Sequence, residues 1–102
     1  MKKHYKVVTQ DLKSLGLRRN KNIMLFKIGE EVKDETMLYA DKRDNGGIWV
    51  ANGLGNARSL KKYMAGKGVE CRIFLVEIGI VLFSNSYRTK TDKVKLVEEV
   101  LN

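Results

Sequence analysis

The sequence contains no proline, one cysteine and one histidine, and each shortage narrows the possible classes of protein. Cys71 has no second cysteine to pair with, which excludes a small fold held together by internal disulfides. Because His4 is the single histidine, the clustered ligands of a structural zinc site are missing. A histidine-based nucleophile triad would depend on His4 alone, and no nucleophile motif accompanies it. The sequence therefore predicts neither a metal site nor a cofactor.

Long hydrophobic runs are also missing from the sequence. The most apolar stretch, residues 73–83, is about half as long as a membrane-spanning helix and contains Glu77 and Gly79. Lys2 and Lys3 are followed by further polar residues instead of the apolar segment of a secretion signal. We therefore expect a soluble, cytoplasmic protein without a membrane partner.

Residues 1–102 are expected to form one domain, because the chain is short for two. Hydrophobic residues make up 43% of the sequence, which is near the average for globular proteins and argues against wholesale disorder. Cys71, Trp49 and Phe74 are expected to contribute to the core of this domain.

Positive charge is in excess and is unevenly distributed along the chain. The sequence has 20 Lys and Arg against 12 Asp and Glu, a formal net charge of +8. Residues 1–28 hold eight bases and one acid, residues 46–72 hold five bases and one acid, and residues 29–45 are acidic. Segregated positive charge attracts polyanions, and nucleic acid is the commonest polyanion in cells. A basic surface can also serve solubility alone.

Short strands and polar loops are predicted for the N-terminal half. Strands are expected at residues 4–9, 23–28, 37–39 and 48–51, and loops at 17–22 and 30–35. Thr9 is a suitable N-cap for a short helix over residues 10–15, and Gly16 stands where such a helix would end. Asn45 and Gly46 are the residue types of a tight hairpin turn leading into the last of these strands.

The clearest helix is predicted over residues 57–65, with Asn56 as its N-cap and Gly66 as its stop signal. Three apolar residues at helical spacing form one stripe: Ala57, Leu60 and Met64. Three cations share a different face: Arg58, Lys61 and Lys62.

The C-terminal part predicts further strands. Residues 71–76 are apolar on both faces, as a central strand covered on each side would be. Gly79 is expected to mark a bend before a strand at 80–83, and the polar stretch 84–92 is expected to be a loop. Residues 93–101 fit either a helix or a strand, and a strand is favoured for their first half.

These elements predict the fold class α+β. We expect a mixed or mostly antiparallel sheet of about five strands, with one firm helix at residues 57–65 and a short N-terminal helix.

One candidate anion site follows the strand at 48–51. There the chain passes through Gly53-Leu54-Gly55 into the helix, so backbone N–H groups and the helix N-terminus could face an anion, and Arg58 could grip the same oxygens. The third glycine of a dinucleotide fingerprint and the ending of a P-loop are both missing. A purely geometric role is the alternative, with glycines turning a corner and Asn56 capping the helix.

Two basic clusters form a second candidate site, one near the N-terminus and one on the helix. Tyr5 and Tyr63 could offer stacking planes beside them, and the polar loop at 85–91 adds hydroxyl groups beside two cations. Solvated surface faces and a plain connecting loop are the alternatives. The residues predicted to contact phosphates are Lys2, Lys3, Lys6, Arg18, Arg19, Lys21, Gly53, Gly55, Asn56, Arg58, Lys61, Lys62 and Arg88.

The order of the elements resembles that of small ADP-ribosyltransferase-type domains. The resemblance rests on a strand, Thr9, a short helix, Leu15-Gly16-Leu17, then Gly46-Gly47-Ile48-Trp49-Val50-Ala51, the helix Ala57–Ala65 and a long apolar strand. It implies a nicotinamide dinucleotide bound in a cleft between strands. The Ser/Thr motif and the catalytic glutamate of that family are not assigned to positions of this sequence.

Three functions are compatible with these features. The first is a non-catalytic basic domain that binds nucleic acid or another phosphate-rich partner without sequence specificity. The second is a small enzyme that handles a phosphate or nucleotide, arranged like an ADP-ribosyltransferase and using the Gly53-Leu54-Gly55 turn. The third is an interaction module that binds an acidic protein. The sequence leaves catalytic activity and the oligomeric state open.

Overall fold

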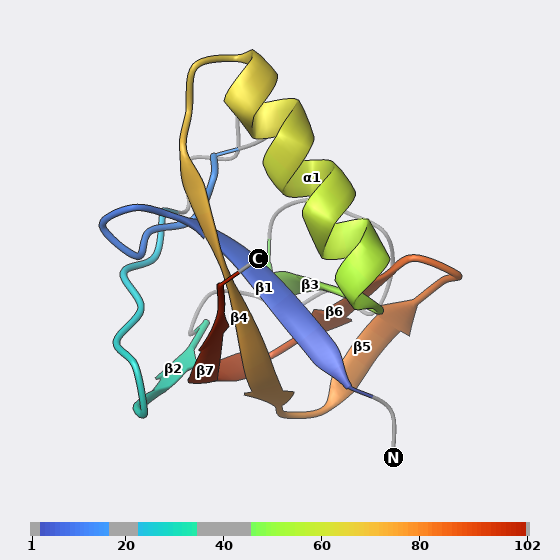
Figure 1. The fold of residues 1–102 in the computed structure, drawn as a ribbon. Coiled ribbons are helices and arrows are strands. Elements are labelled where there is room, and N and C mark those ends of the chain that lie inside the picture. Colours follow the sequence, from blue (N-terminus) through green and yellow to red (C-terminus); the bar gives the residue numbers. More distant parts are fainter. Residues whose placement is uncertain (1–2, 17–22, 35–45, 102) are drawn as a thin grey trace.

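The computed structural model describes residues 3–16, 23–34 and 46–101 (Figure 1). In these ranges the elements follow in the order β1 (His4–Thr9), β2 (Glu31–Lys33), β3 (Ile48–Ala51), α1 (Leu54–Gly66), β4 (Cys71–Ile78), β5 (Val81–Ser84), β6 (Arg88–Thr91) and β7 (Lys93–Val100). The strands form one sheet in the order β2-β7-β4-β1-β3-β6-β5, and every pairing between them is antiparallel. The predicted α+β class is confirmed.

The helix α1 covers one face of the sheet, where it contacts β1, β4 and β3. Successive residues of a strand point to opposite faces, so Val7 packs under the helix while Val8 packs on the other face. In the same way Ile73 and Phe74 of β4 contribute to different clusters. The prediction that this strand is covered on both sides is therefore confirmed, and Cys71 is buried as expected.

The sheet has seven strands among the described residues instead of the expected five or so. β2 forms within the acidic segment that predicts a loop, where Val32 pairs with Val94 of β7. β6 forms within the polar stretch 84–92, and its residues Thr89, Lys90 and Thr91 are all buried. β2 forms by pairing with the distant β7, and β6 by pairing with its neighbour β5 and with the distant β3, so the composition of these strands alone does not predict them.

The expected helix at residues 10–15 is wrong. The chain turns there instead, and Leu12 has a positive φ of 63°, which a right-handed helix excludes. The Thr9 hydroxyl accepts a hydrogen bond from the Lys13 amide at 2.9 Å, one residue beyond the amides that a helix N-cap would bind. The following residues, however, pair with the next segment, because the Phe26 amide donates to the Leu12 carbonyl at 2.8 Å.

The expected strand at residues 23–28 is also wrong as a continuous element. Only isolated bridges occur there, between Leu25 and Lys13 and between Ile28 and Leu96. Phe26 is 1% exposed and belongs to the core on the face opposite α1. This segment is therefore anchored by the burial of one side chain and not by regular strand pairing. The strand expected at 37–39 and the first residues of the turn before Gly46 lie outside the described residues.

The predicted helix at 57–65 is confirmed, but it begins earlier and its capping differs. Gly53 is the N-cap in an extended conformation, so Asn56 lies in the first turn and does not cap the helix. Gly66 is the last helical residue, and the left-handed conformation occurs at Gly68, with a φ of 80°. The predicted apolar stripe packs on the sheet, with Ala57 and Met64 buried.

Near the C-terminus, β7 extends over the segment for which a strand was favoured in the first half. Gly79 marks the predicted bend between β4 and β5. None of the helices in the described part of the chain is long and apolar enough to cross a membrane.

Candidate functional site

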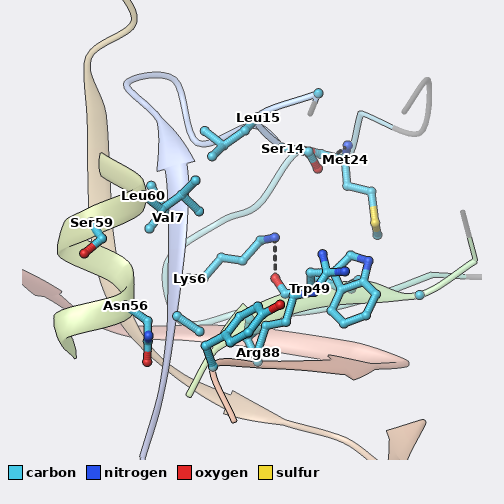
Figure 2. A pocket seen from close by; sticks show the side chains of 16 residues that line it. Lys6, Val7, Ser14, Leu15, Met24, Trp49, Asn56, Ser59, Leu60 and Arg88 are labelled. Atoms are coloured by element: carbon cyan, nitrogen blue, oxygen red, sulfur yellow. Dashed lines mark hydrogen bonds between the residues drawn. The ribbon is translucent and has the colours of Figure 1, made fainter. Parts of the chain in front are cut away.

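The sheet splits between its neighbouring strands β1 and β3. These strands pair at one position, Tyr5 with Ala51, whereas β1 pairs with β4 along its whole length. Beyond that position a side chain replaces the ladder, because the Lys6 ammonium donates a hydrogen bond to the Trp49 carbonyl at 2.7 Å. The gap opens into a cleft of about 380 Å³ (Figure 2).

Elements that are far apart in the sequence line this cleft. Its walls come from β1, residues 14–16, β3 together with the preceding Gly47, the first half of α1, and residues 87–88 at the start of β6. Figure 2 shows Asn56, Ser59 and Leu60 on the helix side and Ser14 and Met24 on the loop side. Small-molecule sites typically measure about 300–1,000 Å³, so the cleft has the size of a small ligand.

Lys6 is the cation at the base of the cleft. Its stem is partly buried beside Phe26, whose ring centroid lies 5.8 Å from the Lys6 Nζ. Burial disfavours the charged ammonium and lowers the pKa of Lys6 to about 8. At neutral pH this lysine is therefore still mostly protonated, but it loses its proton in a range where ordinary lysines remain charged.

Arg88 is the second cation among the described lining residues, and its guanidinium lies over an aromatic ring. Its guanidinium carbon lies 3.8 Å from the centroid of Trp49. The indole is itself packed edge-on against Phe83, with centroids 5.9 Å apart. Trp49 was expected in the core, but it is only partly buried and lines the cleft.

The chain before Arg88 is fixed by a network of hydrogen bonds. The Asn85 side chain accepts bonds from the backbone amides of Tyr87 and Arg88 at 3.0 and 2.9 Å. Asn52, which follows β3, donates from its side chain to the Asn85 carbonyl at 2.6 Å and accepts from the Thr89 hydroxyl at 2.6 Å. This stretch is therefore more than a plain connection, because it positions Arg88 relative to β3.

The electrostatics of the cleft favour an anion over a metal ion. Lys6 and Arg88 are the cations among the described residues that line it, and none of the described acidic residues does so. Across residues 3–16, 23–34 and 46–101, no three His, Cys, Asp or Glu side chains gather in a group that could hold a metal ion. Both observations concern the described part of the chain.

The predicted phosphate-contacting residues occupy different places. Three of them line the cleft: Lys6, Asn56 and Arg88. Others lie elsewhere on the described surface, with Gly53 capping α1 and with Lys3, Gly55, Arg58 and Lys62 exposed and Lys61 partly buried. The remaining four lie outside the described residues: Lys2, Arg18, Arg19 and Lys21.

The cleft also contains residues that sequence reasoning missed as site residues. Trp49 provides both the carbonyl that Lys6 contacts and the ring that Arg88 covers. Ser14, Ser59 and Tyr87 complete the polar lining. No local pattern marks these residues, because each comes from a different element and only the fold brings them together.

Comparison with known proteins found no matching family model, no matching curated protein and no matching solved structure.

Proposed function

We propose that the protein binds a small ligand that carries a phosphate or carboxylate group in the cleft between β1 and β3. The observation that carries this proposal is that two cations, Lys6 and Arg88, contact the same residue, Trp49, within one cleft. An ionised ligand group that meets both cations would form charge-assisted hydrogen bonds away from bulk water. The proposal concerns binding and assigns no reaction.

The two cations would have different roles. The planar fork of Arg88 suits two oxygens of one carboxylate or phosphate, while the Lys6 ammonium acts as a point charge. Leu15, Leu60 and Met24 provide apolar surface for the uncharged part of the ligand. A nucleotide has both an anionic phosphate group and a less polar base. The proposed ligand is therefore of the same class as in the second function compatible with the sequence, a protein that handles a phosphate or nucleotide.

Thermal denaturation with a ligand panel tests the proposal. The panel contains inorganic phosphate, pyrophosphate, mononucleotides and a nicotinamide dinucleotide, the last because of the resemblance to ADP-ribosyltransferase-type domains. A ligand that binds the folded state at about one hundred times its Kd should raise Tm by about 10 °C. No rise with any member of the panel would contradict the proposal.

Matched variants locate the binding site. Lys6→Met and Arg88→Met keep an unbranched apolar side chain and remove the charge, so each should weaken binding by roughly tenfold or more. Lys33→Met is the control, because Lys33 is an exposed strand lysine on β2 at the far edge of the sheet. Equal affinity in all three variants would exclude the cleft as the site.

A second candidate function is contact with nucleic acid through the exposed cations of α1, and it is favoured by the exposure of Arg58 and Lys62 on this helix. Replacing Arg58, Lys61 and Lys62 together with Ala should weaken DNA or RNA binding for every sequence. The slope of log K against log salt should become shallower by about 2 to 3, because each phosphate contact contributes about 0.9.

An unchanged slope in fluorescence anisotropy would show that α1 does not contact the nucleic acid. Capture of a partner that survives nuclease treatment would point to an acidic protein instead.

A further inference from the structure

We propose that Lys6 forms an imine with an aldehyde or ketone that carries a carboxylate or phosphate group. The cleft would then hold its ligand through a reversible covalent bond. This inference rests on the proposed function and deepens it, because it names the class of ligand. It follows from the place of the Lys6 amine within the fold and from the cations around it.

The fold holds the Lys6 amine at a defined place. Lys6 lies in the middle of β1, which pairs with β4 along its full length, so its backbone is fixed. Its Nζ sits 2.7 Å from the Trp49 carbonyl, at the split between the strands, and the residue lines the cleft (Figure 2). A ligand in the cleft would therefore lie beside the Lys6 side chain.

The surroundings of this amine favour its neutral form. Desolvation by burial lowers the pKa of Lys6 to about 8. The charged groups that approach the same tryptophan are also cations, with Arg88 at 3.8 Å and Lys90 at 5.8 Å from the Trp49 ring centroid. Desolvation of a lysine is a known way to make its amine nucleophilic.

The chemical step is balanced without an oxidant or a reductant. The lone pair of the neutral Lys6 Nζ attacks the carbonyl carbon, and the carbonyl oxygen takes up a proton. The nitrogen then loses its proton, and the carbinolamine expels its hydroxyl group, with a proton, as water. This leaves a carbon–nitrogen double bond at Nζ.

Arg88 determines the class of carbonyl compound. Its guanidinium lies against the Trp49 ring in the cleft that Lys6 lines, so an anionic group of the ligand would be anchored beside the reacting carbonyl. A small oxo acid or a phosphorylated aldehyde has both groups within a few bonds. Such a ligand fits a cleft of about 380 Å³.

Reductive trapping on the wild-type protein tests the inference. The protein is incubated with glyoxylate and cyanoborohydride, which reduces an imine to a stable secondary amine, and modified lysines are mapped by peptide mass spectrometry. At about pH 7.5, a lysine with a pKa near 8 has roughly two hundred times more neutral amine than an ordinary lysine, although lower basicity reduces this advantage. We therefore expect Lys6 to be modified at least about tenfold faster than the exposed Lys33 and Lys67 in the same sample.

The outcomes separate this inference from the proposed function. Modification of Lys6 no faster than Lys33 would overturn the inference, while a rise in Tm with pyrophosphate would leave the proposed function standing. Arg88→Met should reduce the selectivity for Lys6 with glyoxylate but not with an uncharged aldehyde such as propanal. Equal selectivity with both probes in the wild type would overturn the assignment of an anionic ligand class. Because the main measurement uses the wild-type chain, it does not depend on the folding of any variant.

Discussion

Lys6 shows how strongly the role of one side chain depends on the strand opposite it. As part of an N-terminal basic cluster it is one of several interchangeable cations in the sequence. In the fold it faces the same side of the sheet as the fully buried Val8 and reaches the Trp49 carbonyl at 2.7 Å. Burial separates it chemically from the exposed Lys3.

The stability of the protein should depend on pH through Lys6. The folded chain releases this proton at about pH 8, while an unfolded lysine keeps it to about pH 10.5. Between these values the unfolded state binds more protons, so the free energy of unfolding rises with pH as the cost of burying the charged Lys6 is removed, by about 3 kcal/mol in all. Below pH 8 both states are protonated and Lys6 contributes no slope.

Urea denaturation at a series of pH values from about 7 to 10 measures this dependence. The wild type is compared with Lys6→Met, in which the contribution is lost, and with Lys33→Met, in which it is retained. The difference between wild type and Lys6→Met should move in favour of the wild type as the pH rises. Parallel profiles for these two proteins would show that Lys6 titrates as an ordinary lysine.

At the scale of elements, prediction succeeded where a segment carries its own signals. The helix α1 has an apolar stripe at helical spacing, and β4 is apolar on both faces, so both were predicted. β6 was missed because its buried residues Thr89, Lys90 and Thr91 are polar. A helix was predicted in place of the turn at Leu12 because Thr9 is a common N-cap residue. In the fold the Thr9 hydroxyl binds the Lys13 amide within the turn, and the Leu12 carbonyl accepts a hydrogen bond from the Phe26 amide.

The bend between β4 and β5 should tolerate no side chain at Gly79. A Cβ there would overlap with the Asp92 carboxylate and lie 2.5 Å from Lys93 Cγ. The same carboxylate accepts a hydrogen bond from the Ile80 amide at 2.9 Å, so it cannot move without loss. We expect Gly79→Ala to reduce the free energy of unfolding by roughly 1–3 kcal/mol.

Chemical denaturation of Gly79→Ala beside Gly55→Ala checks this expectation. Gly55 lies in the first turn of α1 with nothing within 4 Å of an added Cβ. Gly55→Ala should leave stability unchanged or increase it by up to about 1 kcal/mol, because alanine is the better helix former. A Gly79→Ala variant as stable as Gly55→Ala would mean that the bend rearranges easily.

At the scale of the whole molecule, the distribution of charge divides into two sites with different geometry. Lys6 and Arg88 come together in the cleft, whereas Arg58 and Lys62 are exposed on α1. The first arrangement suits a small anion within an enclosed volume, and the second suits an extended polyanion that runs over a surface. The experiments with Arg88→Met and with the triple alanine variant of the helix address these sites separately.

The sequence by itself determined the fold class, the helix, the central strand and the cationic character of the candidate site. These properties are local, because periodicity, apolar content and charge can be read within one segment. Only the tertiary structure decided that β1 and β3 separate beyond Tyr5 and Ala51 and that the Lys6 ammonium and the Arg88 guanidinium meet at Trp49. The physical reason is that strand pairing and burial bring together residues more than forty positions apart. The free energy of such contacts depends on both partners, so the sequence of one segment does not predict it.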